Sequence, residues 1–375
     1  MTLSAKRLNR ATLGRQLLLR REALEVTEGV RRVMALQAQE AASPYLALWN
    51  RLARFEPTDL DAAFTKRTVV KASLMRITLH TVHVDDYPAL HQVMVSSLRA
   101  ARLGDPRFTG SGLTIPDLDA LLPHLTDFMA QPRTRAEVEG MLAARLGFQH
   151  PGVWWALRTF APLWHAPSGG PWSFGLRPSF VTARSPLTPD RAEAVQHLVR
   201  RYLEAFGPAS IQDVAQFTRL SRAVVRDAVN ALGGELQRWQ GPDGSNLYDL
   251  PGAWLPDEDT PAPPRLLPMW DSTLLAYQDR GRVIPPDYRR LVIRQNGDVL
   301  PTLLVDGYVA GVWRAVEGGI EATAFHPLPE EVWAGLASEA GALVAFLAGR
   351  DPSVYRRYTH WWGRLPVADI RLLPG

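Results

Sequence analysis

The stretch from residue 191 to residue 250 constrains the fold of this 375-residue chain most, because its pattern is three helices followed by a two-stranded hairpin. Apolar spacing predicts helices over residues 191–206 and 208–220, and Ser221 is a favoured N-cap for a third. Residues 235–250 contain a Gly-Pro-Asp-Gly turn between alternating segments, which is typical of a hairpin. This order is that of a winged helix, a variant of the helix-turn-helix. Such units bind DNA or serve as protein-interaction scaffolds, and both roles stay open at this point.

Signals for helix starts recur along the chain. Thr134 with Glu137, and Ser210 with Asp213, have the spacing of capping pairs, in which each side chain satisfies a backbone N–H of the other. Thr58 is a further candidate N-cap. These starts indicate that the winged-helix unit is repeated.

Wings are predicted where the sequence becomes β-branched and alternating. Residues 69–83 predict a first strand pair, after a helical pattern that runs from Thr27 through Leu36. A second wing is predicted from strands at residues 162–165 and 172–175, joined by a glycine-rich turn.

A change of character after residue 254 predicts a domain boundary. Residues 255–264 form a proline-rich linker, and the chain beyond it is rich in β-forming segments. Asn296-Gly297 and Asp306-Gly307 predict two hairpin turns, and a helix is expected over about residues 329–347.

Composition excludes several classes of protein. The chain has no cysteine, which rules out disulfides, thiolate zinc sites, iron–sulfur clusters and cysteine nucleophiles. No stretch approaches the ~18 uninterrupted apolar residues of a membrane helix, and residues 1–10 lack the apolar core of a secretory signal. We therefore expect a cytoplasmic protein, associated with the nucleoid if it binds DNA, and no membrane partner.

The positive charge is carried almost entirely by arginine. Only three of the 42 cationic residues are lysines, and the net charge is +4. Arginine suits bidentate contacts with phosphate and guanine, although a GC-rich genome would produce the same bias.

Familiar catalytic motifs are missing. The chain has no glycine-rich phosphate loop, no G-x-S-x-G and no H-E-x-x-H. His80 and His83 are the closest histidines, but on a strand their side chains would face opposite sides. We therefore expect no metal and no cofactor.

Two glutamines in an apolar segment are the remaining candidates for chemistry. Gln37 and Gln39 flank Ala38 within Met34–Ala41. In a regular helix their side chains would point about 200° apart, whereas in an extended segment they would share a face. Spacing alone fits equally a helix end with solvated glutamines.

Longer stretches of the sequence resemble the bacterial winged-helix DNA glycosylase family of AlkZ and YcaQ. The resemblance covers nearly the whole chain, is strongest over the first 90 residues, and rests on Leu13–Arg20, Leu36–Gln39, Ser43–Trp49, Leu74–His80, Leu267–Arg280 and Pro301–Arg314. The AlkZ branch carries a Gln-apolar-Gln motif, which Gln37-Ala38-Gln39 matches, whereas the YcaQ branch has Asp at the second position.

The resemblance implies an α+β fold of three tandem winged-helix units around a DNA-binding channel, with a β-rich C-terminal portion. With the boundaries indicated by the sequence, we expect the units at 1–90, 91–187 and 188–258, and the C-terminal domain at 259–375. Nothing in the sequence demands a dimer, so we expect a monomer.

The resemblance also implies an activity. The family hydrolyses the N-glycosidic bond of N7-alkylated purines and unhooks interstrand crosslinks of the azinomycin type, a form of antibiotic self-resistance by base excision repair. Gln37 and Gln39 would position the attacking water, and the partner would be double-stranded DNA carrying such lesions. A lyase needs a desolvated amine, and only Lys66 and Lys71 lie near the motif, so we expect a monofunctional glycosylase.

Candidate DNA contacts lie at two places in the chain. Around the first wing they are Lys71, Arg76, His80 and His83, and at the tip of the Asn296-Gly297 turn they are Gln295 and Asn296. The alternatives to catalysis are a winged-helix transcriptional regulator and a resistance protein that sequesters the drug.

Overall fold

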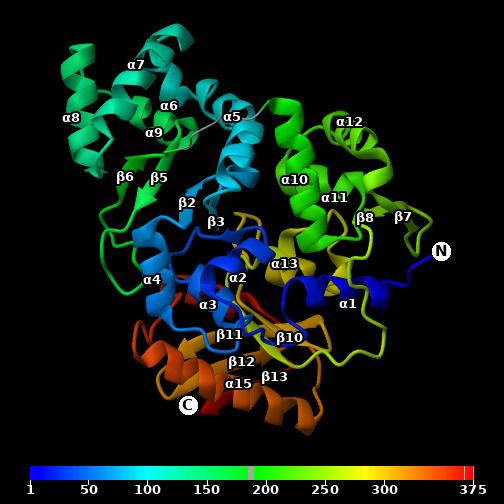
Figure 1. The fold of residues 1–375 in the computed structure, drawn as a ribbon. Helices are drawn as coiled ribbons and strands as arrows, with labels where there is room; N and C mark the ends of the chain where they lie inside the picture. Colours follow the sequence, from blue (N-terminus) through cyan, green and yellow to red (C-terminus); the bar gives the residue numbers. More distant parts are fainter. Residues whose placement is uncertain (185–189, 367, 375) are drawn as a thin grey trace.

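The computed structural model describes residues 1–184, 190–366 and 368–374. It has the expected α+β fold, with three groups of helices and short strands above a β-rich C-terminal portion (Figure 1). The boundary predicted at residue 187 lies outside the described residues. The other predicted unit boundaries, near residues 90 and 258, stay predictions.

The first unit combines four helices with a small sheet. Its elements are α1 (Ala5–Arg15), α2 (Val26–Arg32), β1 (Leu36–Gln37), α3 (Ser43–Trp49), α4 (Pro57–Lys66), β2 (Val69–Ser73), η1 (Met75–Ile77) and β3 (Leu79–His83). The predicted strand pair over residues 69–83 is confirmed. Two details are wrong. Helix α2 ends at Arg32 instead of continuing to Leu36, because Leu36 pairs with β3. Helix α4 starts after Glu56 and has Pro57 in its first turn, so Thr58 is not its N-cap.

The second unit adds five helices and three strands. They are α5 (Tyr87–Leu103), α6 (Pro106–Thr109), α7 (Ile115–Phe128), β4 (Arg133–Thr134), α8 (Arg135–Leu146), α9 (Pro151–Phe160), β5 (Leu163–Ala166) and β6 (Ser179–Thr182). The capping box of Thr134 and Glu137 is confirmed at the start of α8. The strands of both units form one antiparallel sheet in the order β1-β3-β2-β5-β6-β4, joined where Lys71 pairs with His165.

The second strand of the second wing was predicted at residues 172–175, and this is wrong. That segment is a loop, and β6 lies at residues 179–182. The Trp172 side chain packs in the core, where its ring centroid lies 5.1 Å from that of Tyr45. The neighbouring Ser173 hydroxyl donates a hydrogen bond to Asp61. Contacts with the first unit therefore override the local strand pattern.

The third unit agrees with its prediction. It contains α10 (Arg191–Phe206), α11 (Ile211–Thr218), α12 (Arg222–Leu232), η2 (Gly233–Glu235), β7 (Gln237–Gln240) and β8 (Asn246–Asp249). Ser210 and Asp213 form a capping box, and the Ser221 hydroxyl accepts a hydrogen bond from the Val224 N–H. β7 and β8 pair as the predicted hairpin.

The C-terminal portion is β-rich, as expected. Its elements are β9 (Arg265–Leu267), α13 (Ser272–Leu275), η3 (Arg280–Arg282), η4 (Pro286–Tyr288), α14 (Arg289–Val292), β10 (Thr302–Val305), β11 (Tyr308–Val316), β12 (Gly319–Ala324), α15 (Glu330–Ala348), η5 (Arg356–Arg364) and β13 (Asp369–Pro374). The sheet is antiparallel in the order β13-β12-β11-β10-β9, and the turn at Asp306-Gly307 joins β10 to β11 as predicted. The predicted turn at Asn296-Gly297 is flanked by a single antiparallel β-bridge, between Ile293 and Val299, so it does not join two full strands.

Helix α15 lies along the C-terminal sheet at the bottom of Figure 1. Among the described residues it is the one helix long and apolar enough to cross a membrane by length and composition. Its buried residues recur at helical spacing, from Trp333 through Leu336, Ala340 and Leu343 to Leu347, and they belong to the core that α3 and the sheet share.

Candidate active site

The segment with the two glutamines is extended. After α2 the backbone turns at Met34, whose φ is 68°, and Leu36 and Gln37 then pair with Thr81 and His80 of β3. The Ala38 N–H continues the pairing by donating to the Leu79 carbonyl at 2.8 Å. The extended pairing therefore reaches Ala38, and Gln39 lies in the bend that follows it, so the segment is not the regular helix that would point the two side chains about 200° apart.

The two amides differ in exposure. Gln37 is buried, with 5% of its surface exposed, whereas Gln39 is exposed in the bend that leads into α3. Arg76 Nη2 donates to Gln37 Oε1 at 2.7 Å. Because a guanidinium carries only donors, the atom of Gln37 that faces Arg76 must be its oxygen, which fixes the orientation of the amide.

Arg76 is positioned by its place in a turn and by an aromatic ring of the third unit. It lies at the turn between β2 and β3 with a φ of 55°, and its guanidinium carbon is 4.8 Å from the ring centroid of Phe217 in α11. A helix of the third unit therefore supports the residue that orients Gln37.

His80 completes this cluster as a neutral side chain. Burial, followed by the charge of Arg76, lowers the pKa of His80 well below its usual value. Its Nδ1 lies 3.1 Å from the Thr78 carbonyl, and its Nε2 lies 3.2 Å from Arg76 Nη2. The proton therefore sits on Nδ1, where a carbonyl accepts it, and Nε2 accepts from Arg76.

Lys71 lies on the other face of the sheet. It pairs with Thr81, whereas Gln37 and Ala72 pair with His80, and neighbouring residues on a strand face opposite sides. Lys71 is buried, with its Nζ 4.4 Å from the ring centroid of Phe174. Burial lowers its pKa to about 8, and the nearby Glu40 partly offsets this. The structure thus encloses both Lys71 and His80, which we expected at the DNA surface.

Replacing Lys71 with methionine should stabilise the protein at neutral pH. Because the pKa of Lys71 is lowered, the unfolded chain binds more protons than the folded one between the two pKa values. The loss of folding stability caused by the buried ammonium is therefore complete below pH 8 and vanishes as the pH rises above the unfolded pKa of about 10.4. The shift corresponds to at most about 3 kcal/mol, from which the lost cation–π contact subtracts, so we expect a gain of about 1 kcal/mol. Denaturant unfolding at pH 7 and pH 10 checks this, and a wild-type and K71M pair with the same pH dependence would contradict it.

The remaining predicted contacts lie at the surface or near it. The His83 side chain is 13% exposed, and its Nδ1 accepts a hydrogen bond from the Asp85 N–H. Gln295 and Asn296 are exposed at the tip of their turn, which is anchored where Trp270 Nε1 donates to the Gly297 carbonyl at 2.9 Å.

Glu40 and the residues that hold it were not predicted. The Tyr358 hydroxyl donates to Glu40 Oε1 at 2.9 Å, and Arg357 also donates to it. Trp361, in the same helix η5, donates to Asp298 at 2.9 Å. Helix η5 therefore connects the glutamine segment to the turn that carries Gln295 and Asn296. A carboxylate directly after Gln39 was the available signal, but its partners lie more than 300 residues away.

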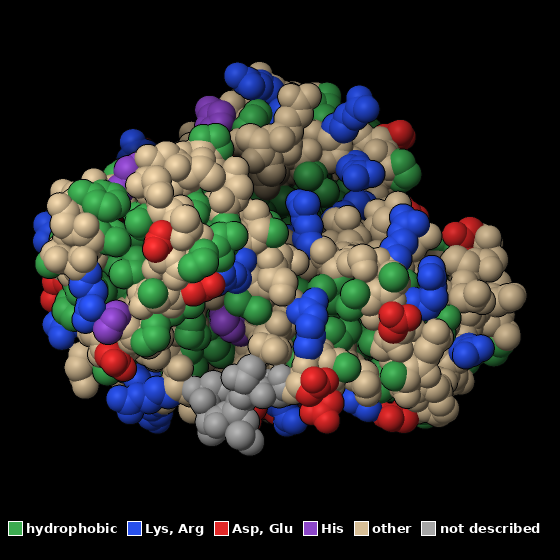
Figure 2. Space-filling model, turned by 90° about the horizontal axis from the view of Figure 1, so that it is seen from above, with side chains coloured by type: hydrophobic (Ala, Val, Ile, Leu, Met, Phe, Trp, Pro, Cys, Tyr) green, Lys and Arg blue, Asp and Glu red, His purple; other side chains and the backbone are tan. Residues whose placement is uncertain are grey.

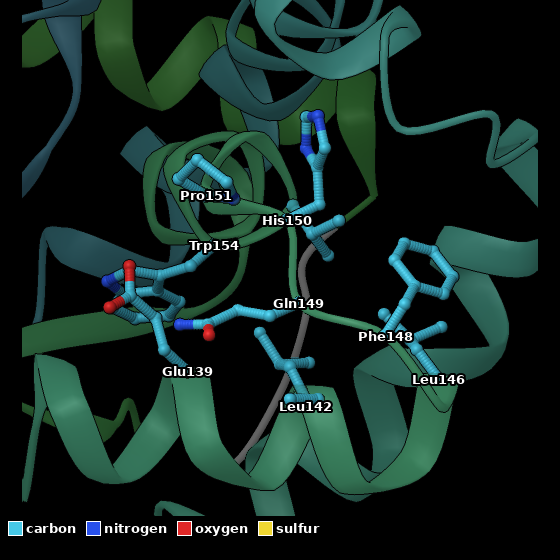
Figure 3. Close-up of a pocket in the computed structure, with 10 residues that line it drawn as sticks. Glu139, Leu142, Leu146, Phe148, Gln149, His150, Pro151 and Trp154 are labelled. Carbon is cyan, nitrogen blue, oxygen red and sulfur yellow. The ribbon is translucent and has the colours of Figure 1, made fainter.

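The surface around the third unit is cationic and hollowed. Figure 2 shows Lys and Arg side chains gathered around a hollow on the right half of the upper face, the side on which Figure 1 places α10 to α12. By contrast, the pocket in Figure 3 lies between α8 and α9, and its volume of about 10 Å³ has room for a single water. There Gln149 points toward Trp154 and Glu139, whereas His150 points away. This pocket shares no residue with the glutamine site.

Comparisons with known proteins match nearly the whole chain. A family model described as DNA glycosylase AlkZ-like matches residues 30–346, a range that includes Gln37, Gln39 and Arg76. An interstrand DNA cross-link repair glycosylase from Streptomyces sahachiroi is 26% identical in an alignment 336 positions long, which covers 83% of this chain and 88% of that protein. The solved structure of Streptomyces sahachiroi DNA glycosylase AlkZ superposes with a TM-score of 0.78 at 23% identity, covering 93% of this chain and 98% of that one. The structural likeness confirms the fold, and the family model covers well over half of the sequence, so the chain belongs to the AlkZ-like DNA glycosylase family.

Proposed function

We propose that this protein is a monofunctional DNA glycosylase that hydrolyses the N-glycosidic bond of N7-alkylated purines and unhooks interstrand crosslinks of the azinomycin type. The observation that carries the proposal is the extended segment in which Gln37 is fixed by Arg76 while Gln39 is exposed. The partner is double-stranded DNA, and the helix and hairpin units act as three tandem winged helices around a DNA-binding channel.

Alkylation at N7 makes two amides sufficient for this chemistry. It puts a positive charge on the purine, which then leaves readily, so the enzyme has to hold a water and stabilise a sugar with oxocarbenium character instead of supplying a strong acid. An amide oxygen accepts a hydrogen bond from the water and directs its lone pair toward the anomeric carbon. A neutral amide is a weak base, so undamaged purines stay in place.

The different surroundings of the two glutamines support different roles for them. Gln37 Oε1 already accepts a hydrogen bond from Arg76, which leaves its NH₂ group and one lone pair for other partners. Gln39 forms no side-chain hydrogen bond within the described residues and is exposed. We therefore assign Gln39 to the attacking water and Gln37 to supporting that water or the substrate from the interior.

An exposed Gln39 also fits a crosslinked substrate. A base that is tied to both strands cannot swing into a deep pocket, which is the usual strategy of glycosylases. An amide presented at an open surface can reach the sugar while the duplex stays mostly stacked.

Duplex DNA containing 7-methylguanine tests the proposal. We expect release of 7-methylguanine and heat-labile abasic sites, no release of unmodified adenine or guanine, and unhooking of an azinomycin-type crosslink. A transcriptional regulator or a drug-sequestering protein would leave all of these substrates intact. Borohydride should trap no covalent enzyme–DNA adduct, and a trapped adduct lost in K71M would show instead that the desolvated Lys71 acts as a lyase nucleophile.

A further inference from the structure

The second unit contains a cavity of about 380 Å³ that shares no residue with the glutamine site. It lies between α6, the start of α8 and α9, in the group of helices at the upper left of Figure 1, and its volume is that of a small-ligand site, roughly 300–1,000 Å³. Three of the residues that line it are Arg107, Arg135 and Arg158, and none of its described lining residues is acidic. His150 also lines it, and Figure 3 shows this side chain pointing away from the smaller pocket. The cavity therefore offers only positive or neutral groups to a ligand.

Helix α9 supplies one wall of the cavity. Pro151, Trp155 and Arg158 follow one another at spacings of four and three residues, which places them on one face of the helix. Gly152 lets α6 pack against the start of α9, because a Cβ at this position would lie 1.7 Å from the Arg107 carbonyl oxygen. Backbone packing therefore fixes the position of Arg107 relative to the helix.

Two guanidiniums lie over the Trp155 ring. The guanidinium carbon of Arg107 is 4.5 Å from the ring centroid, and that of Arg102 is 4.4 Å from it. Arg107 lines the cavity, whereas Arg102 does not. The Arg107 side chain is 67% exposed, so a ligand in the cavity can reach its guanidinium. A planar guanidinium held over an indole is a surface on which an unpaired nucleic-acid base stacks.

The three arginines also have donors left for an anion. Arg107 donates to Asp105 at 3.2 Å and Arg135 donates to Glu139 at 2.9 Å, each through Nε alone. Arg158 is exposed and forms no side-chain hydrogen bond or ion pair within the described residues. The Arg135 side chain is 56% exposed as well. The terminal nitrogens of all three therefore remain available to a ligand that enters from solvent.

We propose that this cavity binds one nucleotide of a single DNA strand, whose base stacks on Arg107 and whose phosphate is held by Arg135 and Arg158. The phosphate supplies the negative charge that the lining lacks, and the fork of a guanidinium matches two of its oxygens. A duplex offers no free base face to Arg107, because its bases stack on one another. The inference goes beyond the proposed function, since it concerns binding alone and holds whether or not the protein releases a base.

Fluorescence anisotropy with a labelled tetranucleotide of deoxyadenosine tests the proposal. Arg158→Gln should weaken binding about tenfold, because one charge-assisted contact is lost, and should lower the slope of log K against log salt by about 0.7. The matched control is Arg145→Gln, which removes the charge of an exposed arginine of α8 that does not line the cavity. R145Q should bind like the wild type, and both variants should keep the wild-type Tm, because both side chains are exposed. An R158Q protein that binds as tightly as R145Q would overturn the proposal.

Arg107→Lys separates base stacking from the attraction of charge. Lysine keeps the positive charge but has no planar guanidinium to lie over Trp155. R107K should therefore bind the tetranucleotide about fivefold more weakly than the wild type, and should bind an abasic tetramer of deoxyribose phosphate equally well. Equal affinity of R107K and the wild type for the deoxyadenosine tetranucleotide would make the cavity a site for any anion and would refute the proposal.

Competitors identify the source of the ligand. Free deoxyadenosine monophosphate should displace the labelled tetranucleotide only at higher concentration than the unlabelled tetranucleotide does, and tetraglutamate should not displace it. A mononucleotide that competes better than the tetranucleotide would contradict the assignment to a DNA strand. Displacement by tetraglutamate as effective as that by the mononucleotide would show a cationic surface without preference for nucleotides. Because none of these ligands is damaged DNA, a protein that binds them as expected but releases no 7-methylguanine would sink only the proposed function.

Discussion

Gln39→Ala should lower the single-turnover rate of 7-methylguanine release by about a hundredfold or more, the usual effect of losing one group that stabilises a transition state. The exposed amide is the one free to hold water, and alanine leaves that water without an acceptor. Its Tm should match that of the wild type, because the exposed side chain forms no hydrogen bond within the described residues. Binding to undamaged duplex should also be retained, because the substitution removes no positive charge.

Gln37→Ala should lower the rate to a similar extent but with a different signature. It removes the acceptor of Arg76 and leaves a buried guanidinium nitrogen without that partner, so its Tm should fall as well. Gln149→Ala is the control for loss of an exposed amide, since Gln149 lies in the α8–α9 connection. A Gln39→Ala enzyme as fast as Gln149→Ala would show that Gln39 is not part of the chemistry.

Local signals predicted the helices of the third unit and the start of α8. The capping pairs at Thr134 and Ser210, and the N-cap at Ser221, were found from the sequence because both partners lie within three residues. Together with the hairpin turn, these signals predicted the order of helices and strands in the third unit. The strand over residues 69–83 was also predicted, since its β-branched pattern and its partner strand lie next to each other in the chain.

Errors occurred where a distant partner decided the conformation. Leu36 fitted a helical pattern, but a partner on β3, 45 residues later, made it a strand. The same pairing makes the segment around Gln37 extended, whereas the sequence left both the helical and the extended conformation open there. Glu40 was missed for the same reason. Contacts that join η5 to the first unit leave no trace in local spacing.

Replacing Asp271 with alanine should destabilise the protein by about 3–5 kcal/mol, the cost of leaving one partner of a buried ion pair uncompensated. Both side chains are 0% exposed, and Arg51 contacts the carboxylate with two nitrogens, at 2.8 and 2.9 Å. Asp271 also caps α13 through the Thr273 N–H, so the pair fixes the segment that leads to Arg280 against the first unit. The midpoint of denaturant unfolding measures the loss. Asp119→Ala, which breaks a partly exposed pair with Arg99, should cost at most about 1 kcal/mol.

The pH dependence identifies the ion pair as the cause of this loss. Burial alone would raise the pKa of Asp271, but the charge and hydrogen bonds of Arg51 outweigh it and hold the pKa below its usual value. The stability that this carboxylate contributes is therefore complete above the unfolded pKa of about 3.9 and is lost as the pH falls through the folded pKa. The difference between wild type and D271A should accordingly shrink in acid. In the double variant R51M/D271L the apolar side chains should restore most of the stability at neutral pH, because no buried charge is left without a partner. If the double variant is as unstable as D271A, the cost comes from the lost cap of α13 and the packing around it, and the paired charge is not what holds the two segments together.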